Sequence, residues 1–184
     1  MPADNALHKA AHKGDLEECK KLIETPDDDE DPIDVNCPGA SERKPIHRAA
    51  GAGHLELCIY FLDKGAGINM PDNSGRTALH WSAISGNDKI VTLLLSRGAD
   101  IMAVTKTGMS ALHGACEAGR KDVVAAILQS VAADEEKKNN LCNLKNAENK
   151  TAWDVAFGAK NSEVCKTLKE MGDPNGASSS CTIS

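Results

Sequence analysis

Histidine is the side chain best suited to acid–base chemistry near neutral pH and to metal binding, and four histidines recur regularly in this chain. His47, His80 and His113 follow one another at intervals of 33 residues, and His8 lies 39 residues before His47. A metal or catalytic site needs side chains that converge, whereas one histidine per repeated unit is spread along a stack. The sequence also has no phosphate-binding loop with its Lys-Ser/Thr pair and no Gly-x-Ser-x-Gly elbow. We therefore assign no catalytic, cofactor-binding or metal-binding residues and predict a structural role for these rings.

Cys181 is the residue whose surroundings most suggest covalent chemistry. It begins the last four residues of the sequence, Cys181-Thr182-Ile183-Ser184, after a Ser-rich stretch. This order resembles a CaaX prenylation box, in which a terminal Ser favours a farnesyl group, although Thr182 is not aliphatic and no polybasic run precedes the cysteine. Two interpretations are open. Cys181 is either a lipidation site that gives reversible membrane association, because one lipid chain binds a membrane only marginally, or an unmodified residue in a flexible tail.

The elements that position these residues follow from the 33-residue period, which is typical of stacked repeats. In the third copy Thr77 can cap a short helix over residues 78–85, which Gly86 ends. A second, more apolar helix covers residues 90–95, and Gly98 stops it. Two such helices cannot bury their apolar faces alone, but copies stacked side by side can.

The residues of this copy carry a family resemblance. Gly-Arg-Thr-Ala-Leu-His-Trp-Ser-Ala (75–83) and Val-Thr-Leu-Leu-Leu-Ser-Arg-Gly-Ala-Asp-Ile (91–101) resemble an ankyrin repeat, whose Thr-Pro-Leu-His-x-Ala signature has the same period. Ala78 and Ala111 stand where the signature has proline. The resemblance implies an all-α fold, an ankyrin-repeat solenoid of stacked helix-turn-helix units with extended hairpin-like loops.

We expect one ankyrin domain over residues 1–172 with five repeats, at about 4–38, 39–71, 72–104, 105–145 and 146–172, and a flexible tail at 173–184. Repeat one is longer than the period, and its extra residues lie around the acidic run Asp27–Asp31. We interpret this run as a solvated loop, and leave open whether it serves recognition or solubility. Repeat four has eight extra residues within Ser130 to Asn140, which either extend the helix or loop out. Repeat five replaces Leu-His by Trp153-Asp154, as expected of a terminal copy.

Most of the seven cysteines fit the repeat register. Cys19, Cys58 and Cys165 occupy the place of Val91 in the second helix, and Cys142 falls where Ile101 lies, under the extended segment. We therefore predict that they are buried thiols acting as small hydrophobic residues. Buried thiols, with no secretory signal at the start of the sequence, favour a cytoplasmic protein.

The ankyrin resemblance also implies a concave surface that binds a partner, formed by the residues that precede, begin and end each first helix. In this register the expected contacts are Arg43, Asn73, Ser74, Arg76, Trp81, Ile84, Ser85, Lys106, Met109 and Glu117. Trp81 has two interpretations, because Trp is enriched in binding hot spots but also packs between neighbouring first helices.

The composition and net charge limit the classes of partner that the protein can bind. Hydrophobic residues make up 41% and aromatic residues 3% of the chain, and the net charge is −6. This acidity argues against nucleic acid as a partner, and no apolar run reaches the roughly 20 residues of a membrane span. We expect a non-enzymatic, monomeric adaptor that binds another protein through the concave ankyrin surface. The alternative is the same adaptor prenylated at Cys181 and tethered to a membrane.

Overall fold

The computed structural model describes residues 3–24 and 31–171. Cys181 and the acidic residues Asp27 to Glu30 lie outside the described residues, so the expectations for them stay predictions. The described elements are α1 (Ala6–Lys13), α2 (Leu16–Glu24), a short 3₁₀ helix η1 (Ala40–Glu42), α3 (Pro45–Ala52), α4 (Leu55–Asp63), α5 (Ala78–Ser85), α6 (Asp88–Ser96), α7 (Ala111–Glu117), α8 (Lys121–Ser130), α9 (Glu135–Asn143), α10 (Ala152–Gly158) and α11 (Ser162–Glu170).

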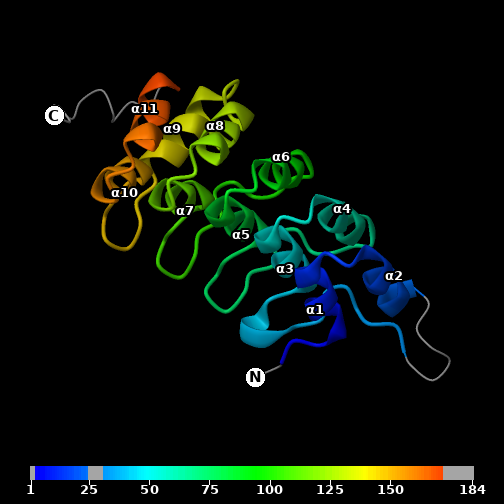
Figure 1. Cartoon of the computed structure of the whole chain (residues 1–184). Coiled ribbons are helices and arrows are strands. Elements are labelled where there is room, and N and C mark those ends of the chain that lie inside the picture. Colours follow the sequence, from blue (N-terminus) through cyan, green and yellow to red (C-terminus); the bar gives the residue numbers. More distant parts are fainter. Residues whose placement is uncertain (1–2, 25–30, 172–184) are drawn as a thin grey trace.

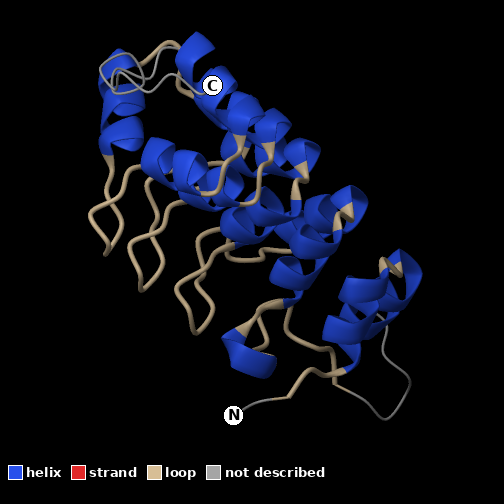
Figure 2. Cartoon of the chain, turned by 60° about the vertical axis from the view of Figure 1, so that its left-hand side comes forward, coloured by secondary structure: helices blue, strands red, loops and turns tan. Residues whose placement is uncertain are grey.

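The helices are stacked as pairs. The first helices α1, α3, α5, α7 and α10 form one row, each in contact with the next, and the second helices α2, α4, α6, α8 and α11 form another (Figure 1). The connecting loops project together on one side of the stack (Figure 2). The predicted all-α solenoid is therefore confirmed.

Polar caps and glycines set the helix ends. The side chain of Asn5 accepts a hydrogen bond from the backbone N–H of His8 and starts α1. Gly86 ends α5 with a φ of 89°, in the left-handed region that glycine adopts without steric cost. Lys160 takes the corresponding place after α10 with a φ of 58°, so the fifth pair is closed by a strained residue.

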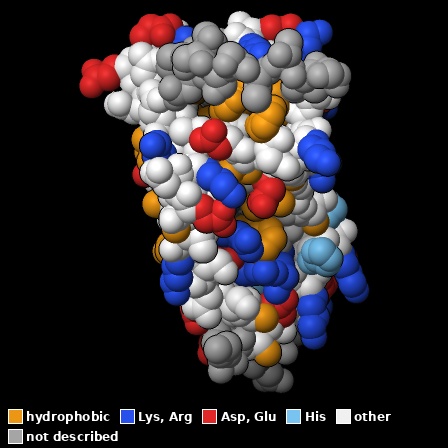
Figure 3. Space-filling model, turned by 90° about the vertical axis from the view of Figure 1, so that its left-hand side faces the viewer, with side chains coloured by type: hydrophobic (Ala, Val, Ile, Leu, Met, Phe, Trp, Pro, Cys, Tyr) orange, Lys and Arg blue, Asp and Glu red, His pale blue; other side chains and the backbone are white. Residues whose placement is uncertain are grey.

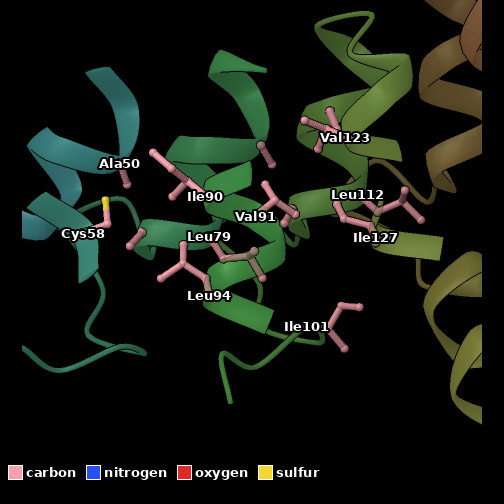
Figure 4. Close-up of a cluster of buried hydrophobic side chains, with 14 of the residues drawn as sticks. Ala50, Cys58, Leu79, Ile90, Val91, Leu94, Ile101, Leu112, Val123 and Ile127 are labelled. Atoms are coloured by element: carbon pink, nitrogen blue, oxygen red, sulfur yellow. The ribbon is translucent and has the colours of Figure 1, made fainter. Parts of the chain in front are cut away.

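A continuous apolar core lies between the two rows of helices. Figure 4 shows Leu79 of α5, Val91 and Leu94 of α6 and Ile127 of α8 within one layer of it, and all four are buried. Cys58 lies at the edge of the same cluster. Cys19, Cys58 and Cys165 are buried, as predicted from their register with Val91.

The environment predicted for Cys142 was wrong. Cys142 is buried, but it lies in α9, an extra helix between the fourth and fifth pairs, and not under an extended segment. The inserted residues form this helix because the Asp134 side chain caps its start by accepting from the N–H of Lys137. Leu141 and Cys142 then bury one side of the helix, which contacts α10.

The recurring histidines have the predicted structural role, because they bond to the backbone. Each ring is buried, and its Nε2 contacts the carbonyl oxygen of a residue that lies further along the chain, in the loop beneath its helix. These contacts are His8 to Arg43 (2.9 Å), His47 to Met70 (2.9 Å), His80 to Met109 (3.1 Å) and His113 to Lys150 (3.2 Å). The histidines therefore connect each first helix to the loop that follows it.

A second set of ties joins neighbouring pairs at the other end of the first helices. In the second to fifth pairs, the residue just before the second helix donates a hydrogen bond to a carbonyl oxygen near the end of the first helix of the preceding pair. The bonds are His54 Nε2 to His12 O, Asn87 Nδ2 to Ala50 O, Arg120 Nε to Ile84 O and Asn161 Nδ2 to Cys116 O, at 3.0, 2.8, 3.0 and 2.8 Å. Hydrogen bonds thus join the first helices to neighbouring parts of the stack at both of their ends.

Within the described residues, none of the helices combines the length and the apolar character that crossing a lipid bilayer would require.

The buried histidines make the stability depend on pH. Burial lowers the pKa of His8, His80 and His113, and it lowers that of His47 to about 4. The unfolded chain binds protons on these rings near pH 6.5 and the folded chain does not, so the free energy of unfolding falls as the pH drops from 6.5 to 5. His47 alone accounts for about 2 kcal/mol at pH 5. Urea unfolding monitored by circular dichroism at several pH values measures this loss.

A variant separates the buried rings from other titrating groups. His47→Gln should reduce the pH dependence of the free energy of unfolding by about one proton, because it removes a buried ring whose pKa is lowered to about 4. A free energy of unfolding that is constant between pH 6.5 and 5 would contradict the prediction.

Candidate functional site

Four loops project beside the first helices, and we call them fingers A (39–43), B (72–76), C (105–109) and D (146–150). In each finger the backbone N–H of the first residue donates to the carbonyl oxygen of the last, at 2.8 to 2.9 Å. Successive fingers are also bonded to one another, by Asn73 N–H to Ser41 O, Lys106 N–H to Ser74 O and Ala147 N–H to Thr107 O, at 2.9, 3.0 and 2.9 Å. The fingers therefore form a continuous wall and not separate mobile loops.

A groove of about 800 Å³ runs between this wall and the first helices α5, α7 and α10. Fingers B, C and D line one side, and residues of the three helices line the floor and the other side. Seven of the ten residues expected to contact a partner line it: Asn73, Ser74, Arg76, Ile84, Lys106, Met109 and Glu117. Residues from three successive helix pairs thus converge on one surface.

Gly114 forms part of the groove floor, and the sequence analysis did not single it out. It is a buried residue of α7, and a Cβ atom placed on it would lie 2.8 Å from Cγ1 of Ile84. The missing side chain lets Ile84 of α5 lean over α7. Met109 of finger C lies nearby, with its Sδ 3.2 Å from Nδ2 of Asn146. The signal in the sequence was the lone glycine directly after the Leu112-His113 pair.

The remaining expected residues lie beside the groove or away from it. Trp81 and Arg43 are half-buried and adjoin the groove through Arg76, while Ser85 is exposed at the end of α5 and does not line it. The guanidinium carbon of Arg43 is 4.1 Å from the Trp81 ring centroid, and that of Arg76 is 5.2 Å away. These distances are within the range of cation–π attraction.

Asp72 holds this arrangement together, and it was another residue that the sequence analysis missed. Its buried carboxylate accepts the N–H of Ser74 (2.7 Å) and of Arg76 (2.9 Å) through Oδ1, and the indole N–H of Trp81 (3.1 Å) through Oδ2. The Trp81 ring also lies 3.8 Å from the position of a Cβ on Gly51 of α3. Trp81 therefore packs against the neighbouring first helix α3, and its ring also contacts two arginines, while its role as a partner hot spot stays a prediction.

The charges on this side of the molecule are mixed. Figure 3 shows Lys and Arg side chains near the middle of this face, interspersed with acidic side chains and next to exposed hydrophobic atoms. Among the described residues, no group of three or more His, Cys, Asp or Glu side chains is placed to hold a metal ion. The arrangement offers polar, charged and apolar contacts along a preformed surface, which suits recognition of another molecule.

Comparison with known families agrees with this architecture. The family described as "Ankyrin repeats (3 copies)" matches residues 7–105, more than half of the chain. The protein belongs to the ankyrin-repeat family. Ankyrin repeats are protein–protein interaction modules, and the helix pairs beyond residue 105 continue the same stack. No curated protein matches the sequence significantly.

Removing the Asp72 carboxylate should loosen finger B and release the Trp81 ring. We expect Asp72→Ala to lower the free energy of unfolding by about 1–3 kcal/mol, because two backbone N–H groups and the indole N–H lose their acceptor. Urea unfolding gives the first effect, and the tryptophan emission spectrum of the folded protein reports the second.

Asp63→Ala is the matched control, since it removes an exposed aspartate that pairs with Arg97 at the surface. Such pairs contribute about 0–1 kcal/mol. Equal losses of stability in the two variants would show that Asp72 does not organise finger B.

Proposed function

We propose that this ankyrin-repeat protein is a non-enzymatic adaptor that binds a segment of a partner protein in the groove between fingers B to D and helices α5, α7 and α10. The observation that carries the proposal is the convergence of three successive helix pairs on one groove of about 800 Å³. Its walls present side chains and finger backbone together, which is the mixture of contacts that a protein segment can use.

The rigidity of the groove supports this function. Fingers B, C and D are bonded to one another, and fingers C and D are also bonded to His80 and His113, so their geometry exists before a partner arrives. A preformed surface loses little conformational entropy on binding, which leaves more of the contact energy for affinity. We propose that the protein acts in this way as a monomer.

Adding bulk to the groove should block partner binding. The position of a Cβ on Gly158, at the far wall, has no neighbour within 4 Å, so Gly158→Trp can fill the groove without straining the helix. Random linear peptides displayed on phage and selected on the whole protein provide the probe. We expect the enriched peptides to bind Gly158→Trp at least tenfold more weakly in fluorescence anisotropy, about 1.4 kcal/mol.

Lys89→Trp is the control, because it adds the same side chain at an exposed position of α6, away from the groove. Its affinity should equal that of the unchanged protein. Peptides that bind Gly158→Trp with undiminished affinity would place the interaction elsewhere.

A second candidate function, membrane tethering, rests on Cys181-Thr182-Ile183-Ser184 alone. We propose that a prenyl group on Cys181 would act with the partner bound in the groove, since a single lipid chain anchors a protein only marginally. Binding of the partner and of the membrane would then reinforce each other through effective concentration.

The mass of the intact protein from its native cell tests this candidate and also shows whether Ser184 ends the mature chain. Prenylation predicts a mass that lacks the last three residues and gains one farnesyl group with a methyl ester. Cys181→Ser should then lose the added mass and its membrane partitioning. An unmodified mass would reduce the proposal to the adaptor alone.

A further inference from the structure

Arginine and lysine side chains concentrate on the finger side of the second and third helix pairs. Arg43 and Arg76 flank Trp81, Arg48 lies on α3, and Lys106 lies at the tip of finger C. The whole chain carries a net charge of −6. A local group of four cations on an acidic protein is therefore a departure from its average surface.

Only part of this positive charge is compensated. Arg48 pairs with Asp4 at 2.6 Å, and the Nε of Arg43 lies 3.8 Å from Oδ2 of Asp72. Both carboxylate oxygens of Asp72 already accept hydrogen bonds, from the backbone of finger B and from the Trp81 indole. In the part of the chain that the structure describes, no carboxylate lies within 4.0 Å of the charged nitrogens of Arg76 or Lys106.

The arginines also repel one another. The pKa of Arg43 is lowered from its usual value by burial and then by the positive charge of Arg48, with a further contribution from Arg76. An anion bound beside them would relieve this repulsion. Arg76 is half-buried, and water screens a charge less there than on an open surface. The electrostatic attraction between Arg76 and a bound anion is therefore stronger than at a fully exposed arginine.

Arg76 is the point at which these cations meet the groove. It lies over Trp81 and also lines the groove, together with Lys106 on the same finger wall. The floor next to them is apolar, with Ile84 and Met109 around Gly114. The two sides of the groove therefore favour different chemical groups, an anion at the fingers and an aliphatic chain at the floor.

We infer that the partner segment carries an aspartate or glutamate that pairs with Arg76 and Lys106, next to an aliphatic residue that packs on Ile84 and Met109 at the groove floor. This inference rests on the proposed function and specifies the partner's chemistry. A carboxylate on a peptide fits better than a nucleic acid, because Glu117 and Glu148 also line the groove and would repel a chain of phosphates. Arg76 supplies a planar fork that can bind a carboxylate with two hydrogen bonds.

The experiment selects random linear peptides on the unchanged protein and on Arg76→Gln/Lys106→Gln. Peptides from the unchanged protein should be enriched in Asp and Glu over the starting library, and this enrichment should disappear with the double variant. The best acidic peptide should bind the double variant about tenfold more weakly or worse, as expected for the loss of a charge-assisted hydrogen bond. Its Asp→Asn form should lose affinity for the unchanged protein but little for the double variant.

Lys89→Gln/Arg97→Gln is the matched control, because it removes the same charge from α6 and the residue after it, outside the groove. It should retain the acidic enrichment. Peptides that bind in the groove, as shown by their sensitivity to Gly158→Trp, but lack acidic residues and tolerate Arg76→Gln/Lys106→Gln would overturn this inference and leave the adaptor function standing. Absence of any enriched peptide, or binding insensitive to all groove variants, would overturn both.

Discussion

The neutral histidine ring is the constraint on which the stack depends. In the second to fourth pairs, Nδ1 accepts the backbone N–H three residues earlier, from Lys44, Thr77 or Ser110, at 2.9, 3.2 and 3.3 Å. Only an unprotonated Nδ1 can accept this bond, which leaves Nε2–H to donate to the loop carbonyl. His80 and His113 thus fix the start of their helices and also hold fingers C and D, whereas His47 holds Met70, just before finger B. Because the fingers are bonded in series, the groove wall inherits its shape from these rings.

The last pair shows what remains when no further finger follows in the described chain. Asp154 replaces the histidine, and its Oδ2 accepts the N–H and the hydroxyl of Thr151, at 2.9 and 2.8 Å. The helix start is therefore retained, while among the residues up to 171 that the structure describes no hydrogen bond joins Asp154 to a following loop. Phe157 corresponds in register to Ala83, which is fully buried against the next pair, but Phe157 is 42% exposed. The aspartate thus keeps the bond that the histidine makes to the start of its own helix, without the bond to a loop carbonyl further along the chain. Such a change is expected of a terminal repeat.

The sequence predicted what depends on local periodicity and could not predict what depends on contacts between copies. The 33-residue spacing identified the helix pairs, the buried thiols and the structural role of the histidines. It did not identify Asp72, whose three acceptor bonds form only when finger B and α5 meet, or Asn87, whose partner lies 37 residues earlier in sequence. The position of α9 was also missed. Its residues are mostly polar, so no apolar period marked a helix, and burial of Leu141 and Cys142 against the fifth pair is visible only in three dimensions.

The shape of the groove depends on one variable position, which follows the histidine in α3, α5 and α7 and follows Asp154 in α10. That position holds Arg48 in α3, Trp81 in α5, Gly114 in α7 and Val155 in α10. All four residues lie beside the fingers. Arg48 pairs with Asp4, which accepts the N–H of Ala40 in finger A, and Trp81 donates to Asp72 of finger B, while Gly114 and Val155 line the groove. Arg48 and Trp81 place large side chains beside fingers A and B, whereas Gly114 has none and Ile84 of the neighbouring helix packs over it instead. The scaffold residues thus keep the helices and fingers in place, and the sizes and charges at this single position determine the shape of the surface beside the fingers. Arg76 contacts Trp81 and also lines the groove, so it can meet a segment that packs on Ile84 and Met109.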